Sequence, residues 1–367
     1  MLRIDRRLVA NIEWPLLLVT LALVGCGLMT ILSATYQEAR PLSSILVKQT
    51  VWAVAGLAGM LVAMFFDYRL LHRYGYVIYA IAVGSLIVVH FAGVQGGGAR
   101  RWIGVGPVSL QPSEFMKIAL VVVLATNLHR WAGKERLSLG KLVAPIALFA
   151  VPALLILRQP DLGTVILLGL VAFSVLLVAG LPLRLVMVAA IVVGPALPVA
   201  WQHLKPYQKR RITSFLDPQG DPLGAGYHVL QSKIAIGSGM VHGKGYLRGT
   251  QNNLHFLPEQ HTDFVFSVFA EEWGFVGCTL LLSLYGALIL RGLMIAGKAK
   301  DNLGALLAAG LTSIVLWQVV INVAMTSGAL PVVGITLPFL SYGGSSLMAL
   351  LVSVGLVMNV SMRRHVF

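Results

Sequence analysis

The sequence predicts an all-α integral membrane protein with about ten transmembrane helices, forming a single polytopic domain over residues 1–367. Hydrophobic residues make up 57% of the chain and charged residues only 11%, with a mean hydropathy of +0.83. Soluble domains carry about 25% charged residues, so water is not the main solvent of this chain. Apolar runs of roughly 18 to 25 residues, enough to cross ~30 Å of hydrocarbon, recur from Trp14 onwards and are expected as helices.

Ten apolar ranges are expected as helices, with ends accurate to several residues. They cover residues 14–35, 47–66, 75–94, 112–131, 142–158, 162–180, 182–201, 263–294, 301–326 and 340–361. Arg3, Arg6 and Arg7 precede the first range, which is too long for the core of a signal peptide and has no small-residue cleavage site after it. We therefore expect the first helix to be a retained anchor.

The basic residues between these ranges predict the orientation of the chain in the membrane. With the N-terminus in the cytoplasm, the inside segments hold fifteen basic residues and the short outside segments hold five. This excess follows the positive-inside rule and predicts that both termini are cytoplasmic. The long loop between the seventh and eighth helices, residues 202–262, is then extracytoplasmic. The inside residues are Arg3, Arg6, Arg7, Arg69, Arg73, Arg130, Lys134, Arg136, Lys141, Arg184, Arg291, Lys298, Lys300, Arg363 and Arg364; the outside residues are Arg40, Lys48, Arg100, Arg101 and Arg158.

Composition also excludes several classes of function. The formal charge of +14 comes from basic residues that we expect to lie in cytoplasmic loops and to contact lipid headgroups. We therefore expect membrane lipid, and no nucleic acid, as a partner. Cys26 and Cys278 each lie inside an apolar run and are expected to be packing residues. The sequence has no His/Cys ligand set, no G-x-S-x-G motif and no P-loop, which leaves hydrolase and ATPase functions without support.

The loop 202–262 is the longest segment outside the apolar ranges, and loops of this length are functional or disordered. Its segment 226–240 mixes apolar residues with His228 and Lys233, so it is expected to lie flat on the outer leaflet. We find no inverted internal repeat of the kind common in secondary transporters, which counts against a transporter.

Charged residues gather on the predicted outer side, where the membrane makes each of them costly. Glu114 and Lys117 are three residues apart at the start of the fourth helix and are expected to form an ion pair, either structural or functional. Arg100 and Arg101 lie in the loop Gly96–Trp102, where they either contact lipid headgroups or bind a diphosphate.

Two further outer segments offer the same choice. Asp161 follows a very short turn and is expected to cap the sixth helix, with a role in a site as the alternative. Arg210 and Arg211 belong to a basic cluster after the seventh helix, which either contacts headgroups or binds a lipid-linked diphosphate. Sequence alone does not separate these alternatives.

Asp263 lies where the long loop re-enters the membrane at the start of the eighth helix. One interpretation is a helix N-cap, because an aspartate there accepts hydrogen bonds from free backbone N–H groups. The other is a general base, which requires a carboxylate within hydrogen-bond reach of a hydroxyl. Glu271 and Glu272 lie about 12 Å deeper on the same helix and are expected to be protonated unless they pair with a basic residue.

Small and amide residues near the C-terminus have simpler interpretations. Residues 341–346 resemble a glycine-rich phosphate loop but follow no strand, so close helix packing is preferred over substrate contact. Gln318 and Asn322, one turn apart in the ninth helix, are expected to be interhelical hydrogen-bond partners rather than ligands.

Chemistry outside the cytoplasm is restricted, because nucleotide-sugar donors are made inside. A transferase facing outwards must use a lipid-linked donor. Attack of a sugar hydroxyl on a glycosyl diphosphate needs a base, positive charge for the leaving group and a groove for the lipid tail. The outer cluster of charged residues offers candidates for these roles.

Eight motifs resemble those of the SEDS (shape, elongation, division and sporulation) family, and the resemblance spans nearly the whole chain. It is closest to the members that determine rod shape. The motifs are GARRWI (98–103), QPSEFMK (111–117), QPDLGT (159–164), FLDPQGDPLGAGYHVLQSKIAIGSG (215–239), GKGYLRGTQ (243–251), FLPEQHTDF (256–264), AEEWGFVG (270–277) and PVVGITLPFLSYGGSS (331–346).

This resemblance implies a ten-helix peptidoglycan glycosyltransferase that uses lipid II, carries an undecaprenyl-linked glycan and partners a class B penicillin-binding protein, the transpeptidase. It places the chain in the bacterial cytoplasmic membrane, with the active site on the extracytoplasmic side. Asp263 matches the family's essential catalytic residue, and Glu114 and Lys117 match a charged pair that shapes the cavity. We expect Arg100, Arg101, Lys117, Arg210 and Arg211 to bind diphosphate, with a divalent cation such as Mg or Mn as a candidate cofactor. No organic cofactor and no metal-binding residues are identified.

Two other functions remain open at this point. A lipid II flippase would use the same polar cavity without a base, and a scaffold would recruit and activate its transpeptidase without chemistry of its own.

Overall fold

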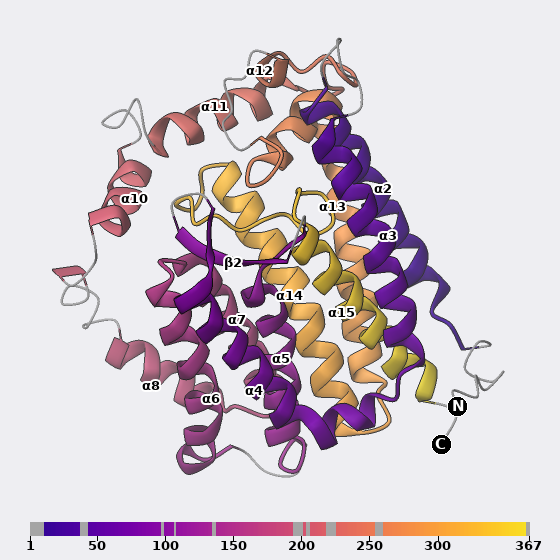
Figure 1. The fold of residues 1–367 in the computed structure, drawn as a ribbon, viewed down its shortest axis with the longest axis vertical. Coiled ribbons are helices and arrows are strands. Elements are labelled where there is room, and N and C mark those ends of the chain that lie inside the picture. Colours follow the sequence, from indigo (N-terminus) through magenta and orange to yellow (C-terminus); the bar gives the residue numbers. More distant parts are fainter. Residues whose placement is uncertain are drawn as a thin grey trace.

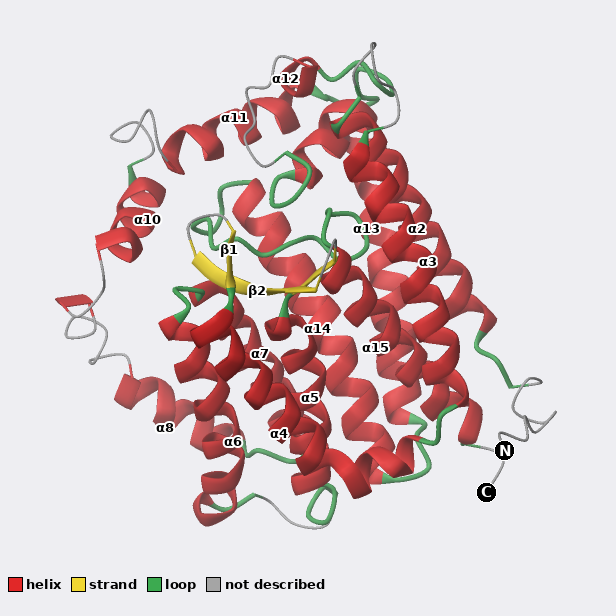
Figure 2. Cartoon of the chain, in the orientation of Figure 1, coloured by secondary structure: helices red, strands yellow, loops and turns green. Residues whose placement is uncertain are grey.

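The computed structural model describes residues 11–36, 43–96, 99–105, 108–133, 137–193, 201–202, 206–217, 225–253 and 260–364. Long helices form one bundle, and shorter helices lie along one side and one end of it (Figures 1 and 2). The bundle helices are α2 (Trp14–Ala34), α3 (Ser44–Phe65), α4 (Tyr68–Ala92), α5 (Pro112–Leu128), α6 (Leu139–Arg158), α7 (Leu162–Val178), α8 (Leu183–Val193), α13 (Val265–Gly297), α14 (Asn302–Thr326) and α15 (Gly344–Arg363).

Each of the ten predicted ranges overlaps one of these helices. Among the described residues, seven helices are long and apolar enough to cross a membrane: α2, α3, α4, α6, α13, α14 and α15. Helix α7 is apolar but has 17 residues, and α8 is described over 183–193 only. The chain is therefore a multi-pass membrane protein.

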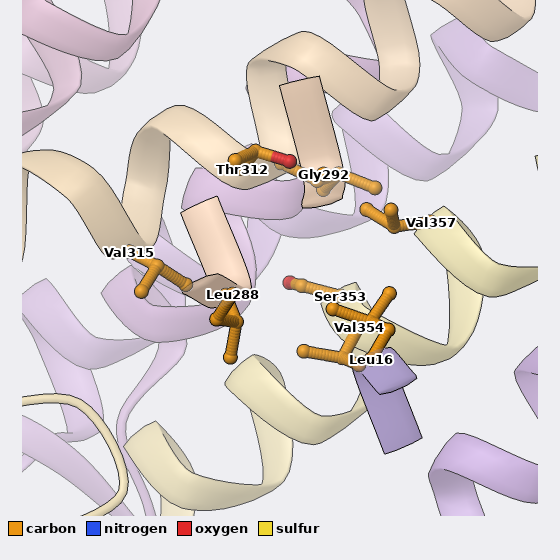
Figure 3. A pocket seen from close by; sticks show the side chains of 9 residues that line it. Leu16, Leu288, Gly292, Thr312, Val315, Ser353, Val354 and Val357 are labelled. Atoms are coloured by element: carbon orange, nitrogen blue, oxygen red, sulfur yellow. The ribbon is translucent and has the colours of Figure 1, made fainter. Parts of the chain in front are cut away.

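Helices α14 and α15 lie at the centre of the bundle. Of their most apolar stretches, 78% and 83% of the residues are buried, against 22% in α4 and 28% in α3. Large apolar side chains of α3 and α4, such as Val54, Val62 and Ile81, are exposed, as a surface in contact with lipid requires. A narrow apolar crevice lies between α2, α13, α14 and α15, lined by Leu16, Leu288, Gly292, Thr312 and Val357 among others, and holds no ionisable side chain (Figure 3).

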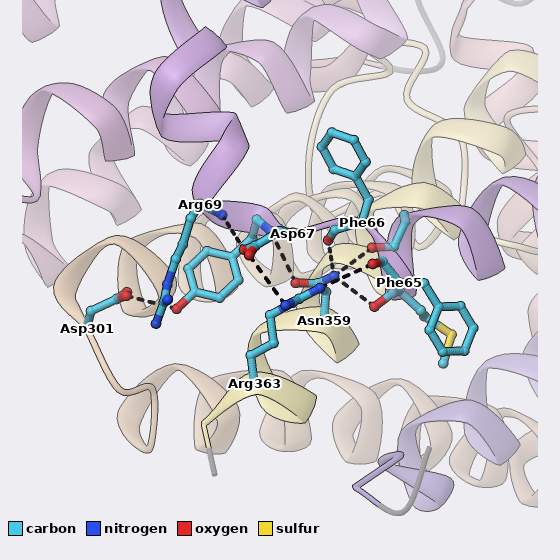
Figure 4. Close-up of polar contacts among 10 residues, drawn as sticks. Phe65, Phe66, Asp67, Arg69, Asp301, Asn359 and Arg363 are labelled. Carbon is cyan, nitrogen blue, oxygen red and sulfur yellow. Dashed lines mark hydrogen bonds and ion pairs between the residues drawn. The ribbon is translucent and has the colours of Figure 1, made fainter. Parts of the chain in front are cut away.

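One buried amide closes the end of the bundle near the chain termini (Figure 4). Asn359 of α15 is fully buried, and its Nδ2 donates to the carbonyl oxygens of Ala63 (3.0 Å), Met64 (2.8 Å) and Phe66. Its Oδ1 accepts the backbone N–H of Tyr68 at 3.4 Å. The last carbonyls of a helix have no partner within that helix, so Asn359 supplies hydrogen bonds that lipid does not.

A small antiparallel sheet forms in place of the loop expected at residues 96–102, while the bundle itself is all-α as predicted. The strands are β1 (Val94–Gly96), β2 (Ala99–Val105) and β3 (Val108–Leu110), in the order β1-β2-β3. The physical reason is that the segment between two helices is rich in Val, Ile and Trp, which favour strands. Alternation along β2 places Arg100 and Arg101 on opposite faces, and Arg100 is exposed.

The segment between α8 and α13 contains α10 (Pro206–Leu216), α11 (Ala225–Ser238) and α12 (Thr250–Asn253). Helix α11 also packs on protein, a contact that the sequence pattern does not predict. Ser232 is buried, and its hydroxyl makes hydrogen bonds of 2.6 Å with the hydroxyl of Ser267 and with the carbonyl oxygen of Thr326. These bonds fasten α11 to α13 and α14.

Helix α13 is broken at Gly274, where the sequence predicts an uninterrupted helix. Gly274 has φ 61° and ψ −162°, a combination open almost only to glycine. The N–H groups of Phe275 and Val276 leave the helical pattern and donate to the carbonyl oxygens of Met240 (2.8 Å) and Val241 (3.1 Å). The break therefore joins α13 to the loop that follows α11.

We predict that Gly274→Ala lowers the free energy of unfolding by about 2 kcal/mol or more, since the new methyl group meets the backbone of Val241 and Gly243 and the residue must keep a positive φ. Thermal unfolding of the purified protein in detergent checks this. Gly286→Ala is the control on the same helix, because nothing lies within 4 Å of the added carbon. Equal melting temperatures for the two variants would show that the break is dispensable.

Candidate functional site

Asp263 lies in the turn 260–264 that leads into α13, and its side chain is partly exposed. The helix begins at Val265 with Phe264 in the N-cap position, so Asp263 stands one residue before the cap. The residue in the N-cap position of α13 is therefore Phe264 and not Asp263.

Three hydrogen bonds hold this turn to the rest of the bundle. The Ser341 hydroxyl donates to the carbonyl oxygen of Thr262 at 2.6 Å, and the Tyr342 N–H donates to that of His261 at 2.7 Å. The Gln260 side chain donates to the carbonyl oxygen of Ala34 at 2.9 Å, at the end of α2. The turn is thus fixed on both sides by segments more than 70 residues away in sequence.

The segment 331–337, between α14 and α15, passes beside the Asp263 carboxylate. Gly334 has φ 75°, and a side chain there would begin 3.4 Å from Oδ2 of Asp263. Asn322 of α14 donates from Nδ2 to the carbonyl oxygens of Asp263 (3.0 Å) and Ile335 (2.7 Å). It therefore joins two loops, rather than two helices as the sequence predicts.

Arg101 binds the turn before α7 with all three guanidinium nitrogens. Its Nε donates to the carbonyl oxygen of Gln159 at 3.1 Å and its Nη2 to that of Pro160 at 2.6 Å, while Nη1 lies 3.6 Å from Oδ2 of Asp161. Asp161 also accepts the N–H of Thr164 at 3.1 Å as the N-cap of α7, which confirms its predicted capping role. The guanidinium group of Arg101 thus binds the 159–161 turn of the protein.

The turn held by Arg101 is connected to the surroundings of Asp263. Gly163, in the first turn of α7, packs so closely on the carbonyl of Val333 that a side chain does not fit between them. Arg211 of α10 reaches the same carbonyl oxygen from Nη1 at 3.5 Å. The segment 331–337 is therefore contacted by α7, by α10 and by the turn of Asp263. The sheet is connected to it through the 159–161 turn.

Glu114 and Lys117 form the predicted ion pair, with Lys117 Nζ 2.6 Å from Glu114 Oε2 and the two side chains only 3% and 10% exposed. They line a narrow crevice together with Ile314 of α14 and residues of α15. Ile314 precedes Asn322 by eight residues, so the pair lies about 12 Å from the Asp263 turn along α14. Burial of both charges makes each of them depend on the other.

Glu271 also has a basic partner, which the sequence leaves open. Lys244 Nζ lies 2.6 Å from Glu271 Oε1, and the same oxygen accepts the backbone N–H of Thr250 at 2.9 Å. Its neighbour Glu272 accepts a hydrogen bond from the Ser33 hydroxyl. Sequence reasoning missed Lys244, because 27 residues separate it from Glu271 and no periodic pattern links a loop to a helix. The pair fastens the loop before α12 to the first half of α13.

The remaining predicted residues are distributed more widely. Arg100 is exposed on β2, and the backbone of Arg210 lies in α10 while its side chain falls outside the described part of the structure. Gly344 packs against the indole ring of Trp52, and Ser345 Oγ accepts the N–H of Gln111 at 3.0 Å. These contacts support packing as the role of Gly344 and Ser345, whereas Ser341 and Tyr342 hold the Asp263 turn.

Three comparisons with known proteins agree with one another. A family model described as "Cell cycle protein", FTSW_RODA_SPOVE, matches residues 14–366. The peptidoglycan glycosyltransferase MrdB of Escherichia coli K12 is 42% identical over 356 residues, covering 96% of this chain and 94% of that protein. The peptidoglycan glycosyltransferase RodA of Treponema pallidum is 35% identical, covering 97% and 99%.

Solved structures show the same likeness. One chain, from work on the structural coordination of polymerization and crosslinking by a peptidoglycan synthase complex, superposes with a TM-score of 0.83 at 34% identity, covering 97% of this chain and 99% of that one. The rod shape determining protein RodA of Thermus thermophilus superposes with a TM-score of 0.72 at 30% identity, covering 96% and 98%.

We predict that Lys117→Met lowers the free energy of unfolding by about 3 to 5 kcal/mol, because Glu114 is then left buried without its counter-charge. The double variant Glu114→Gln, Lys117→Met should recover a large part of the loss. Thermal unfolding of the single and double variants measures the coupling. A double variant no more stable than Lys117→Met would show that the two side chains act independently.

Proposed function

Because the chain belongs to the family of FtsW, RodA and SpoVE cell cycle proteins and is a peptidoglycan glycosyltransferase, we propose that Asp263 is the general base with which it polymerises lipid II. The observation that carries this assignment is the position of Asp263. Its partly exposed carboxylate lies in a turn fixed from several sides, at the junction of the segments that the family motifs mark. A base must be held in this way to meet a hydroxyl within about 3 Å.

The proposed reaction extends a glycan strand by one disaccharide. Asp263 takes the proton from the 4-hydroxyl of the GlcNAc of an incoming lipid II, and the hydroxyl oxygen forms a bond to the anomeric carbon of the growing chain. The bond between that carbon and the diphosphate oxygen breaks, and its electron pair leaves with undecaprenyl diphosphate. Attack from the opposite face inverts the anomeric carbon and gives a β-1,4 link. The proton on Asp263 then returns to solvent.

The leaving diphosphate requires positive charge at the same end of the bundle. Arg100, which is exposed, and Arg211, which contacts the segment beside Asp263, support this role best. Lys117 acts within its ion pair, and Arg210 stays a candidate through its place in α10. Arg101 is reassigned to holding the 159–161 turn, because its nitrogens already bind that turn.

The orientation completes the proposal. Ten transmembrane helices with both termini in the cytoplasm place residues 202–262 and Asp263 on the extracytoplasmic side of the bacterial cytoplasmic membrane. The positive-inside excess supports this arrangement. Reaction of a membrane-impermeant reagent with single cysteines placed in this loop, applied to intact cells, tests it; protection of the loop until the membrane is broken would reverse the orientation.

A divalent cation such as Mg or Mn would neutralise charge on the leaving diphosphate. Among the described residues, no group of three or more His, Cys, Asp or Glu side chains is arranged to hold a metal. The described residues do not form a metal cage, and we propose that the cation binds together with the lipid diphosphate. Full activity in EDTA would remove the cation from the proposal.

The proposed partner is a class B penicillin-binding protein, which would crosslink the strands that this chain polymerises during elongation. The likeness to a chain of a complex that coordinates polymerization and crosslinking supports it. Copurification of this chain with its cognate transpeptidase from the native membrane tests the pairing, and recovery of each protein alone would count against it.

We predict that purified protein with its partner converts lipid II into a ladder of glycan products, and that Asp263→Ala reduces the initial rate at least 100-fold, as expected for loss of a general base. Asp263→Glu should also lose activity, because it displaces the carboxylate by one methylene. The assay is gel separation of labelled glycan, with partner binding and thermal unfolding as controls.

Other outcomes would replace the proposal. Equal transport of lipid II across proteoliposome membranes by wild type and Asp263→Ala, without any ladder, would identify a flippase. Normal wall synthesis in cells carrying Asp263→Ala would leave only a scaffold.

We predict that Arg101→Ala and Arg100→Ala act differently. Loss of Arg101 releases the 159–161 turn and should lower the melting temperature of the protein, with a matching loss of activity. Loss of the exposed Arg100 should leave stability unchanged and raise KM for lipid II several-fold. Thermal unfolding and initial rates at varied lipid II distinguish them. Equal stability and equal KM in the two variants would argue against separate roles.

A further inference from the structure

We infer that Asn322 is a positioning residue for Asp263, and this inference rests on the proposed role of Asp263 as the base. Asn322 acts on the backbone that carries Asp263, through one amide that binds both the Asp263 turn and the segment 331–337.

Burial and hydrogen bonding define the position of Asn322. The residue is fully buried in α14, and its Nδ2 donates to the carbonyl oxygens of Asp263 at 3.0 Å and Ile335 at 2.7 Å. Two carbonyl acceptors require an NH2 group to face them, which fixes the orientation of the amide. Its Oδ1 is buried and has no hydrogen-bond partner within the described part of the chain.

The two hydrogen bonds that Nδ2 donates therefore offset the cost of burying Oδ1 without a partner. A buried polar atom without a partner costs about 1 to 3 kcal/mol. An apolar residue of similar size avoids that cost and packs as well in the centre of a bundle. The amide is best explained by what it holds, which is the peptide of Asp263 itself.

The helix that carries Asn322 makes this a rigid connection. Of the most apolar stretch of α14, 78% is buried. The neighbouring bonds made by Ser341 and Tyr342 reach Thr262 and His261, whereas Asn322 reaches the Asp263 carbonyl and the segment containing Gly334, which faces Oδ2 of Asp263. Asn322 thus sets the distance between the carboxylate and the segment beside it. A misplacement of about 1 Å at a reacting group can cost 100-fold in rate.

The chain contains a matched control at the opposite end of the bundle. Asn359 is equally buried, and its Nδ2 donates to backbone carbonyls of Ala63, Met64 and Phe66. It is a structural amide that joins α15 to the end of α3 (Figure 4). A purely structural role for Asn322 predicts that loss of either amide has the same consequences.

The test compares Asn322→Ala, Asn322→Asp and Asn359→Ala in the full chain, purified with its partner and supplied with lipid II. We expect Asn322→Ala and Asn359→Ala to lower the melting temperature to a similar extent. Asn322→Ala should lower kcat at least 10-fold with KM changed less than about 3-fold. Asn359→Ala should retain the kcat and the KM of the wild type.

Asn322→Asp separates hydrogen bonding from side-chain volume, because it keeps the shape and replaces the NH2 group that faces the carbonyls. We expect it to lose kcat as Asn322→Ala does, and it carries the test if Asn322→Ala fails to fold. Wild-type kcat in a folded Asn322 variant, or equal losses of kcat in the Asn322 and Asn359 variants, would overturn the inference while leaving Asp263 as the base. Activity in Asp263→Ala would instead remove the proposed function, and this inference with it.

Discussion

The structure depends on one constraint: a backbone polar group that is removed from water must find its hydrogen-bond partner inside the protein. Regular helices meet this constraint by themselves, and irregular backbone does not. Three irregular segments of the described chain find these hydrogen-bond partners in different ways. The amide of Asn359 serves the last carbonyls of α3, the loop after α11 accepts the N–H groups released at Gly274, and Asn322 binds the carbonyls on either side of the site. The two hydrogen bonds donated by Asn322 lie at the candidate site.

Buried charged side chains likewise need a partner inside the protein. In the described part of the chain, the buried carboxylates of Glu114, Asp161 and Glu271 each have a basic partner within 4 Å. Two of these ion pairs, Arg101 with Asp161 and Lys244 with Glu271, connect segments distant in sequence. They hold these segments together, and the two charges in each pair neutralise one another. Asp263 differs in being partly exposed, at the level where the backbone leaves the helices. A carboxylate in that position can exchange a proton with solvent and still be held by a rigid frame.

Local features were predictable from the sequence, and features that join distant segments were not. Apolar runs located the helices, the three-residue spacing predicted the pair of Glu114 and Lys117, and the turn before α7 predicted Asp161 as a cap. Each of these follows from contacts within one helical turn. The break at Gly274 and the role of Asn322 depend on partners dozens of residues away, which no sequence periodicity indicates. The small sheet pairs strands that are neighbours in sequence, but its glycine-rich segment predicts a loop instead. Asp263 was found through motif resemblance, since an aspartate before a helix suits a cap equally well.

Gly334 limits how this enzyme can escape an inhibitor. It has a left-handed backbone, and a Cβ added there would lie 3.4 Å from the Asp263 carboxylate oxygen, so a replacement strains the backbone and a large one also crowds the base. A compound that contacts both Gly334 and Asp263 would rest on two positions that cannot change without loss of the enzyme. Resistance selected against such a compound should therefore arise at the periphery of its binding site, or through altered expression, and not at the residues it contacts most closely.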